Sequence, residues 1–227
     1  MDIPTQTIEA ELEKVFIHAM PFGKFWINER IASEFFGVSR TIIRELLFKF
    51  QQRSLISKDD NSHWTVGPLT AAILQHQYEV RHALEPLALR GSSQTIELTY
   101  LSQLIEDLKN NINAEHMNPE DIKKIEYEFH YGIHKNNPNK MLLKMLYQVQ
   151  TPLLIKQTFL ELVGIENASQ TLNEHLAVLT LVRWGAIDAA CEALKFHIET
   201  SANKMYQRLK AFSVLPRPDF PPYLREI

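Results

Sequence analysis

The chain has 227 residues, of which 45% are hydrophobic, and a formal net charge of −3 at pH 7. This composition is typical of one large or two small folded domains, and the overall charge does not indicate a polyanionic partner, so any nucleic-acid surface must be local. The single cysteine, Cys191, excludes an intrachain disulfide framework and a thiolate-rich metal site. No apolar stretch approaches the roughly 20 residues of a membrane span, and the chain does not start with an apolar signal core. We therefore expect a cytoplasmic protein with no membrane partner.

Residues 1–68 predict a small helical unit that ends in a β-hairpin. Helical spacing covers about residues 7–19, and a second short helix, INERIASEFFG, ends at Gly37. We expect this second helix to bury Ile31, Ala32, Phe35 and Phe36. Ser39 then provides an N-cap for the third helix, TIIRELLFKFQQR, because its hydroxyl can accept from the free amides of the first turn. Two strand-like stretches, SLIS and HWTV, follow around the turn KDDNS.

The third helix has two distinct faces. Its expected core stripe is Ile43, Leu46, Leu47 and Phe50, whereas Arg40, Thr41 and Arg44 gather at the exposed N-terminal turn. Recognition helices insert this turn into the major groove, where arginine can bond guanine bidentately. From residue 24 to residue 58, seven Lys or Arg face three Glu, a local excess of about +4. The alternative is an ordinary capped helix with solvated arginines.

The segment PFGKFWINERIASEFFGVSRTIIRELLFKFQQRSLIS resembles the winged helix-turn-helix of the GntR superfamily of bacterial transcriptional regulators, over residues 21–66. The resemblance implies that operator DNA is contacted by Arg30, Ser39, Arg40, Thr41 and Arg44. Two features depart from the family: Ser54 stands where glycine is usual, and the wing tip, usually basic, reads KDDNSH. Two aspartates near a phosphate backbone weaken binding by charge repulsion, which leaves His63 as a minor candidate there.

Residues 69–212 predict an all-α bundle, and residues 213–227 a proline-rich tail. Helical spacing resumes after residue 70, and turns near residues 91, 115, 136, 164 and 183 divide the region into about six helices. Such a bundle is large enough to enclose a pocket. The tail PRPDFPPY cannot be helical and is expected to lie extended on the surface. The predicted fold class is mainly α, with a winged helix-turn-helix followed by a helical bundle.

A second candidate site lies in the bundle. Glu126 and His130 are four residues apart and so share one helix face. His175 and His197 lie at similar distances on either side of the turn RWGAID, so two antiparallel helices would bring their imidazoles to nearly the same height. Three imidazoles and a carboxylate suit zinc, nickel, manganese or iron. His134 is a rival on the stripe of His130, and each histidine could instead be an ordinary core or surface residue.

Four segments of the bundle, YEVRHALEPLA, EYEFHYGIH, NEHLAVLTLVRWGAIDAACEAL and KFHIE, together resemble the ligand-binding FCD domain of FadR-like GntR regulators, over about residues 75–212. The resemblance implies a divalent transition metal, zinc or nickel first, held by His130, His175 and His197, with Glu126 in place of the usual aspartate. It also implies that Arg81 faces the pocket and pairs with the carboxylate of a small organic acid. The alternative for Arg81 is a surface ion pair with the residue four positions on.

These expectations combine into one functional hypothesis. The chain would be a homodimeric GntR-type transcriptional regulator, not an enzyme, whose binding to double-stranded operator DNA is modulated by a small organic acid at a metal-containing pocket. Three alternatives stay open at this point: a metal-free acyl or lipid sensor of the same fold, a metal-dependent enzyme, and a DNA-binding scaffold whose second domain only dimerises.

Overall fold

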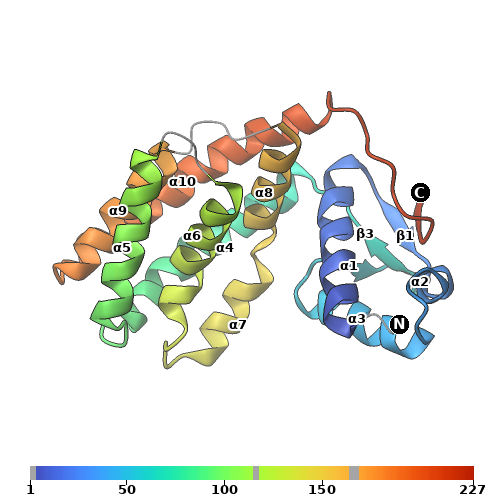
Figure 1. Cartoon of the computed structure of the whole chain (residues 1–227), viewed down its shortest axis with the longest axis horizontal. Coiled ribbons are helices and arrows are strands. Elements are labelled where there is room, and N and C mark those ends of the chain that lie inside the picture. The colour runs from blue at the N-terminus through green and yellow to red at the C-terminus, as the bar shows by residue number, and fades with distance from the viewer. Residues whose placement is uncertain (1–3, 115–117, 164–168) are drawn as a thin grey trace. The chain divides into compact units, whose positions relative to one another are not determined.

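The structure, a computed structural model, describes residues 4–114, 118–163 and 169–227 (Figure 1). It forms two compact units: the first comprises the residues up to Leu74 together with Tyr206–Ile227, and the second is Gln75–Met205. Helices dominate both sequence and structure, which confirms the predicted mainly α fold class. Among the described helices, none is both long and apolar enough to cross a bilayer.

The first unit is a winged helix-turn-helix. Its elements up to the wing are α1 (Thr5–Ala19), η1 (Met20–Phe22), β1 (Phe25–Ile27), α2 (Glu29–Phe36), α3 (Arg40–Gln52), β2 (Ser57–Lys58) and β3 (Trp64–Val66). The predicted stripe of α3 is buried throughout. Its last member, Phe50, packs edge to face on Phe16 of α1 with ring centroids 5.4 Å apart. The apolar stripe therefore fixes α3 against α1 and leaves the opposite face of α3 to solvent.

The orientation of α2 differs in part from the prediction. Ala32 and Phe36 are buried as expected, but Ser33 is buried as well, whereas Phe35 is 53% exposed. The buried positions share one face of a helix of only two turns, and Phe35 lies outside that face. Its ring contacts Tyr223 instead, with centroids 5.3 Å apart. The expectation that Phe35 points into the core was wrong because the end of the chain supplies its partner.

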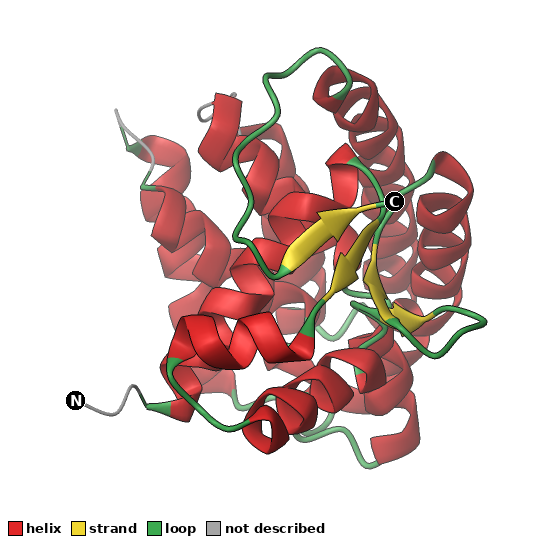
Figure 2. Cartoon of the chain, turned by 90° about the vertical axis from the view of Figure 1, so that its right-hand side faces the viewer, coloured by secondary structure: helices red, strands yellow, loops and turns green. Residues whose placement is uncertain are grey.

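The end of the chain completes the sheet of the first unit, whose strand order is β2-β3-β1-β4 (Figure 2). Strand β4 (Leu224–Glu226) pairs antiparallel with β1, and Trp26 lies opposite Arg225. Two further backbone hydrogen bonds flank the pairing: Asn28 N donates to Tyr223 O at 2.8 Å, and Ile227 N donates to Lys24 O at 3.0 Å. The proline-rich tail, expected to lie extended on the surface, therefore ends in a strand that its sequence did not predict. Tyr223, directly before this strand, is fully buried.

The remaining described helices are α4 (Ala71–Ser92), α5 (Leu98–Asn113), α6 (Pro119–His130), η2 (Gly132–His134), α7 (Lys140–Gln148), α8 (Thr151–Val163), α9 (Ser169–Arg183) and α10 (Ile187–Phe212). Within the second unit α5 packs on α9, and α6 on α8. The turns predicted near residues 136 and 164 imply one helix where the structure has two, α7 and α8. Pro152 explains the break, because proline has no backbone N–H and is accommodated only in the first turn of a helix, which is its position in α8. The turns predicted near residues 115 and 164 fall on positions outside the described residues.

Candidate functional site

Three histidines from three helices meet in the interior of the second unit. His130 ends α6, His175 lies in the middle of α9, and His197 belongs to α10; all three are buried. One ring nitrogen of each lies within 4.8 Å of the other two, and the Nε2 atoms of His175 and His197 are 3.2 Å apart. The imidazoles of His175 and His197 thus lie at nearly the same height on α9 and α10, as the spacing around the turn predicted. His134 lies apart from this group: it is in η2 and contacts the Ser92 hydroxyl at 3.2 Å.

Two carboxylates define the tautomers of this cluster. His130 Nδ1 lies 2.7 Å from Glu85 Oε2, and His197 Nδ1 lies 2.8 Å from Glu174 Oε2. Because an ionised carboxylate only accepts, each Nδ1 carries the proton and each Nε2 presents a lone pair to the cluster. Backing of a histidine by a carboxylate is the usual second layer of a metal site, since it orients the ring and makes it a better ligand.

The cluster leaves buried nitrogen atoms without a hydrogen bond. His130 Nε2 and His175 Nδ1 have no hydrogen-bond partner within the described part of the chain. Burial is the largest influence on the pKa of His175 and of His197 and lowers both, so these rings are neutral near pH 7. A neutral imidazole is the form that binds metal. The lone pair of His130 Nε2, which faces Glu126, is costly to bury unless a cation occupies it. The donor set therefore fits a transition-metal ion.

Glu126, which stands where the resemblance implies an aspartate, also approaches the cluster. Its Oε2 lies 3.9 Å from His130 Nε2, and its Oε1 lies 3.8 Å from His175 Nε2. The same Oε1 accepts a hydrogen bond of 2.6 Å from Lys156 Nζ of α8. Burial is the largest single influence on the pKa of Glu126 and raises it, but Lys156, His130 and His197 together outweigh burial and lower the pKa to about 2. Glu126 is thus ionised, and Lys156 is a site residue that the sequence analysis missed.

Arg81 is part of this polar interior and not of a surface pair. It is 1% exposed, and its Nε donates to Glu85 Oε1 at 2.5 Å. Burial disfavours both charges, yet each partner stabilises the other, so the pKa of Glu85 is lowered and that of Arg81 raised. Glu85 consequently joins Arg81 to His130 through its two oxygens. Arg81 Nη1 has no hydrogen-bond partner among the described residues, which leaves one buried donor facing the interior of the bundle.

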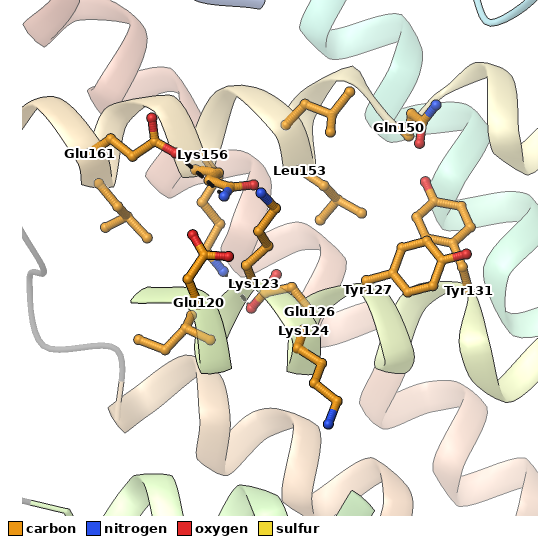
Figure 3. A pocket seen from close by; sticks show the side chains of 14 residues that line it. Glu120, Lys123, Lys124, Glu126, Tyr127, Tyr131, Gln150, Leu153, Lys156 and Glu161 are labelled. Atoms are coloured by element: carbon orange, nitrogen blue, oxygen red, sulfur yellow. Dashed lines mark hydrogen bonds and ion pairs between the residues drawn. The ribbon is translucent and has the colours of Figure 1, made fainter. Parts of the chain in front are cut away.

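A pocket of about 330 Å³ lies between α6 and α8 beside this cluster. Figure 3 shows side chains of the two helices facing each other across it. Glu126 and Lys156 belong to its wall, together with the apolar and aromatic side chains Ile122, Tyr127, Tyr131, Leu153, Leu154 and Leu160. Because Glu126 also approaches the histidines, one carboxylate joins the pocket to the cluster.

The first unit presents the predicted recognition turn to solvent. Ser39 Oγ accepts from Ile42 N at 3.3 Å and so caps α3 as expected. Arg40, Thr41 and Arg44 are exposed. Glu29 of α2 lies 2.7 Å from Arg44 and 3.7 Å from Arg40, and it also accepts from Trp64 Nε1 at 2.8 Å. The hydrogen bond from Arg44 is the main reason that the pKa of Glu29 is lowered.

The local positive excess is smaller in the structure than in the sequence count. Lys49 pairs with Glu9 at 3.0 Å, and Arg53 pairs with Glu13, so these two cations face α1. Arg30, which the resemblance also implies to contact DNA, is exposed and pairs with Glu34 one turn further along α2, at 2.7 Å. The excess therefore does not belong to the recognition turn alone.

The acidic wing tip has a structural role that the sequence did not reveal. Asp59 Oδ1 accepts from Asn61 N at 3.0 Å and from His63 N at 2.8 Å, while its Oδ2 accepts from Trp26 Nε1 at 3.2 Å. One of the two aspartates thus builds the turn. Ser54 has a positive φ of 58°, which explains why glycine suits this position in the family.

Comparison with known proteins identifies the family of the second unit and finds relatives that are similar over most of the chain. Residues 76–200, more than half of the chain, match the FCD domain family. The chain is 29% identical over 189 residues to the uncharacterized HTH-type transcriptional regulator YdhC of Bacillus subtilis, covering 81% of each protein. Its fold is similar to that of E. coli McbR/YncC, with a TM-score of 0.68 at 18% identity, covering 92% of this chain and 99% of the other. A structure described as a transcriptional regulator GntR from Rhodococcus sp. RHA1 gives a TM-score of 0.66 at 16% identity, covering 89% and 97%.

The domain match and the winged-helix architecture agree with each other and with the resemblance seen in the sequence. The chain belongs to the FCD domain family.

Proposed function

We propose that the chain binds operator DNA as a homodimer through α3 and that a small organic acid, bound beside a metal ion in the second unit, modulates this binding. The observation that carries the proposal is the convergence of three buried imidazoles with Glu126. The similarity to transcriptional regulators supports a role in regulation and not in catalysis.

Glu126, His130, His175 and His197 would hold the ion. A set of three nitrogens and one oxygen suits zinc or nickel first, and manganese or iron next. When bound, the ion supplies a docking point for a carboxylate. The residues around it act on the ligands, since Glu85 and Glu174 keep two rings in the metal-binding tautomer.

The charges and the pocket favour an acid with an apolar body as effector. The ammonium of Lys156 donates to Glu126 and lines the pocket, where it would also attract an effector carboxylate. The free donor of Arg81 would add a second contact. The apolar wall of leucines and tyrosines would enclose the rest of the molecule.

The DNA-binding part of the proposal rests on the exposed first turn of α3. The DNA contacts would come from Arg30 of α2, from the N-cap Ser39, and from Arg40, Thr41 and Arg44 of α3. A dimer would place two such turns on adjacent half-sites of a near-palindromic operator. The effector would change operator affinity only by binding the two poses of the dimer with different affinity.

The metal site is tested by elemental analysis of full-length protein that has been stripped with chelator, reloaded and desalted. We expect about one transition-metal ion per chain, lost in the double variant His175→Ala/His197→Ala and kept in His76→Ala, a control at an exposed position. Circular dichroism should show the same helical signal in all three proteins. Retention of stoichiometric metal by the double variant would refute this site.

A metal-free sensor is the second candidate, and one contact favours it. The Lys156 ammonium balances the charge of Glu126 at 2.6 Å without any ion. Absence of metal after reloading, combined with a thermal shift caused by an apolar acid, would support this candidate and would contradict the metal-dependent one.

The DNA-binding surface is tested with a labelled duplex that the full-length protein selects from a random pool. Arg40→Ala and Arg44→Ala should each weaken binding by about 1–3 kcal/mol if they read base edges. Unchanged binding by both variants would refute the assignment of α3 as recognition helix.

A further inference from the structure

The strand that ends the chain brings an additional cation to the DNA-binding unit. Arg225 lies opposite Trp26 of β1 in the antiparallel pairing. It lines a shallow hollow of about 660 Å³ on the first unit. The cationic side chains that line this hollow are Arg30, Arg40, Arg44, Lys58 and Arg225. Residues at opposite ends of the sequence therefore contribute to one basic surface.

Arg225 differs from the predicted recognition arginines in its partners. Arg40 and Arg44 both pair with Glu29. Arg225 is exposed and makes no ion pair with any residue that the structure describes. The neighbouring carboxylate of Glu226 pairs instead with Arg217, at 2.6 Å. The guanidinium of Arg225 is therefore available to an external anion without first breaking a contact within the chain.

The backbone that carries Arg225 is held in place. Tyr223 is fully buried and Leu224 is buried beside it. The Tyr223 ring packs on Phe35 and Phe36 of α2, with centroids 5.3 and 5.7 Å apart. The position of Arg225 is thus set relative to α2, the helix that precedes the recognition helix. An anchored strand loses little backbone entropy when its side chain meets a ligand.

We propose that Arg225 contacts a DNA phosphate and that the C-terminal strand is part of the DNA-binding surface. The proposal rests on the proposed function, because it takes operator DNA as the ligand of the same unit. A phosphate is the expected contact, because a single exposed guanidinium at the edge of a sheet positions a protein on the duplex, whereas base edges are read inside the groove. Arg225 should therefore add affinity and salt dependence, with little effect on sequence preference.

The test measures the dissociation constant of full-length protein for the selected duplex over a range of salt concentrations. Loss of one phosphate contact reduces the slope of log K against log salt by about 0.9. Arg225→Gln should reduce the slope by this amount for each Arg225 that contacts DNA, and so by about twice this amount if both Arg225 of a dimer do. The affinity for unrelated duplexes should fall by a similar factor. Arg225→Lys should restore most of the slope, since a phosphate accepts any nearby cation. The control is Arg183→Gln, which removes an exposed arginine at the end of α9.

The outcomes separate this inference from the proposed function. If Arg225→Gln binds like the unmodified protein while Arg40→Ala binds weakly, the C-terminal strand is not part of the surface and α3 still is. If neither variant is affected, the proposed DNA surface itself is wrong. An equal effect of Arg183→Gln would show a general charge effect and would overturn the role of Arg225. Equal melting temperatures of the variants establish that none of these results reflects unfolding.

Discussion

Replacement of Glu174 tests whether the carboxylate behind His197 belongs to a metal site. Glu174 Oε2 lies 2.8 Å from His197 Nδ1, and its side chain is largely buried. Glu174→Ala removes both the acceptor and the charge, so the ring loses its fixed tautomer and part of its basicity. Loss of such a partner typically weakens metal binding by 10- to 100-fold, which corresponds to about 1.4–2.7 kcal/mol. Glu174→Gln keeps an acceptor without the charge and should lie between Glu174→Ala and the unmodified protein.

The assay is a competition between the protein and a chromophoric chelator for zinc at neutral pH. Glu192→Gln serves as the control, because Glu192 lies on α10 like His197 but is exposed and pairs with Lys195. We expect the order unmodified protein, Glu174→Gln, Glu174→Ala in decreasing affinity, and no change for the control. Equal zinc affinity in all four proteins, with unchanged circular dichroism, would refute the reasoning that assigns His197 to the site.

Three further predictions concern stability and effector binding. Burial lowers the pKa of His134 from 6.5 to about 4, so unfolding takes up a proton between these pH values. The free energy of unfolding should therefore fall by at most about 3 kcal/mol as the pH drops from 6.5. Urea titrations of His134→Gln should show a weaker dependence of the unfolding free energy on pH, and the same dependence as in the unmodified protein would contradict this. Tyr223→Ala should cost about 3–5 kcal/mol, because it empties a fully buried ring site; calorimetry would show a lower melting temperature, and an unchanged one would mean that β4 is not docked. Lys156→Met should abolish the thermal shift caused by an apolar acid while metal remains bound; a retained shift would exclude Lys156 from the effector site.

Local patterns in the sequence were sufficient to predict helix α3. The N-cap Ser39 and the apolar stripe of α3 both depend only on residues three or four positions apart, and the structure confirms them. The meeting of His175 and His197 could also be predicted, because two helices joined by a short turn fix the relative height of their residues.

Contacts between distant segments were beyond the sequence. Strand β4 is three residues long and follows a proline-rich stretch, so it is too short to show the alternation of apolar and polar residues that predicts a strand. Lys156 approaches Glu126 from another helix, 30 positions further along the chain, and nothing in the local pattern of α8 marks it. The role of Asp59 was missed for a related reason, since an acidic turn residue can equally repel phosphates or accept its own backbone amides.

The central claim, that an organic acid at the histidine cluster controls DNA binding, is tested most directly by operator affinity in the presence of carboxylic acids. The measurement is the dissociation constant of metal-loaded, full-length protein for the selected duplex, with and without each member of a panel of aliphatic and aromatic acids. We expect at least one acid to change the constant by about fivefold or more, and to have no effect on His175→Ala/His197→Ala. An unchanged constant across the panel, or the same change in the double variant, would contradict the account.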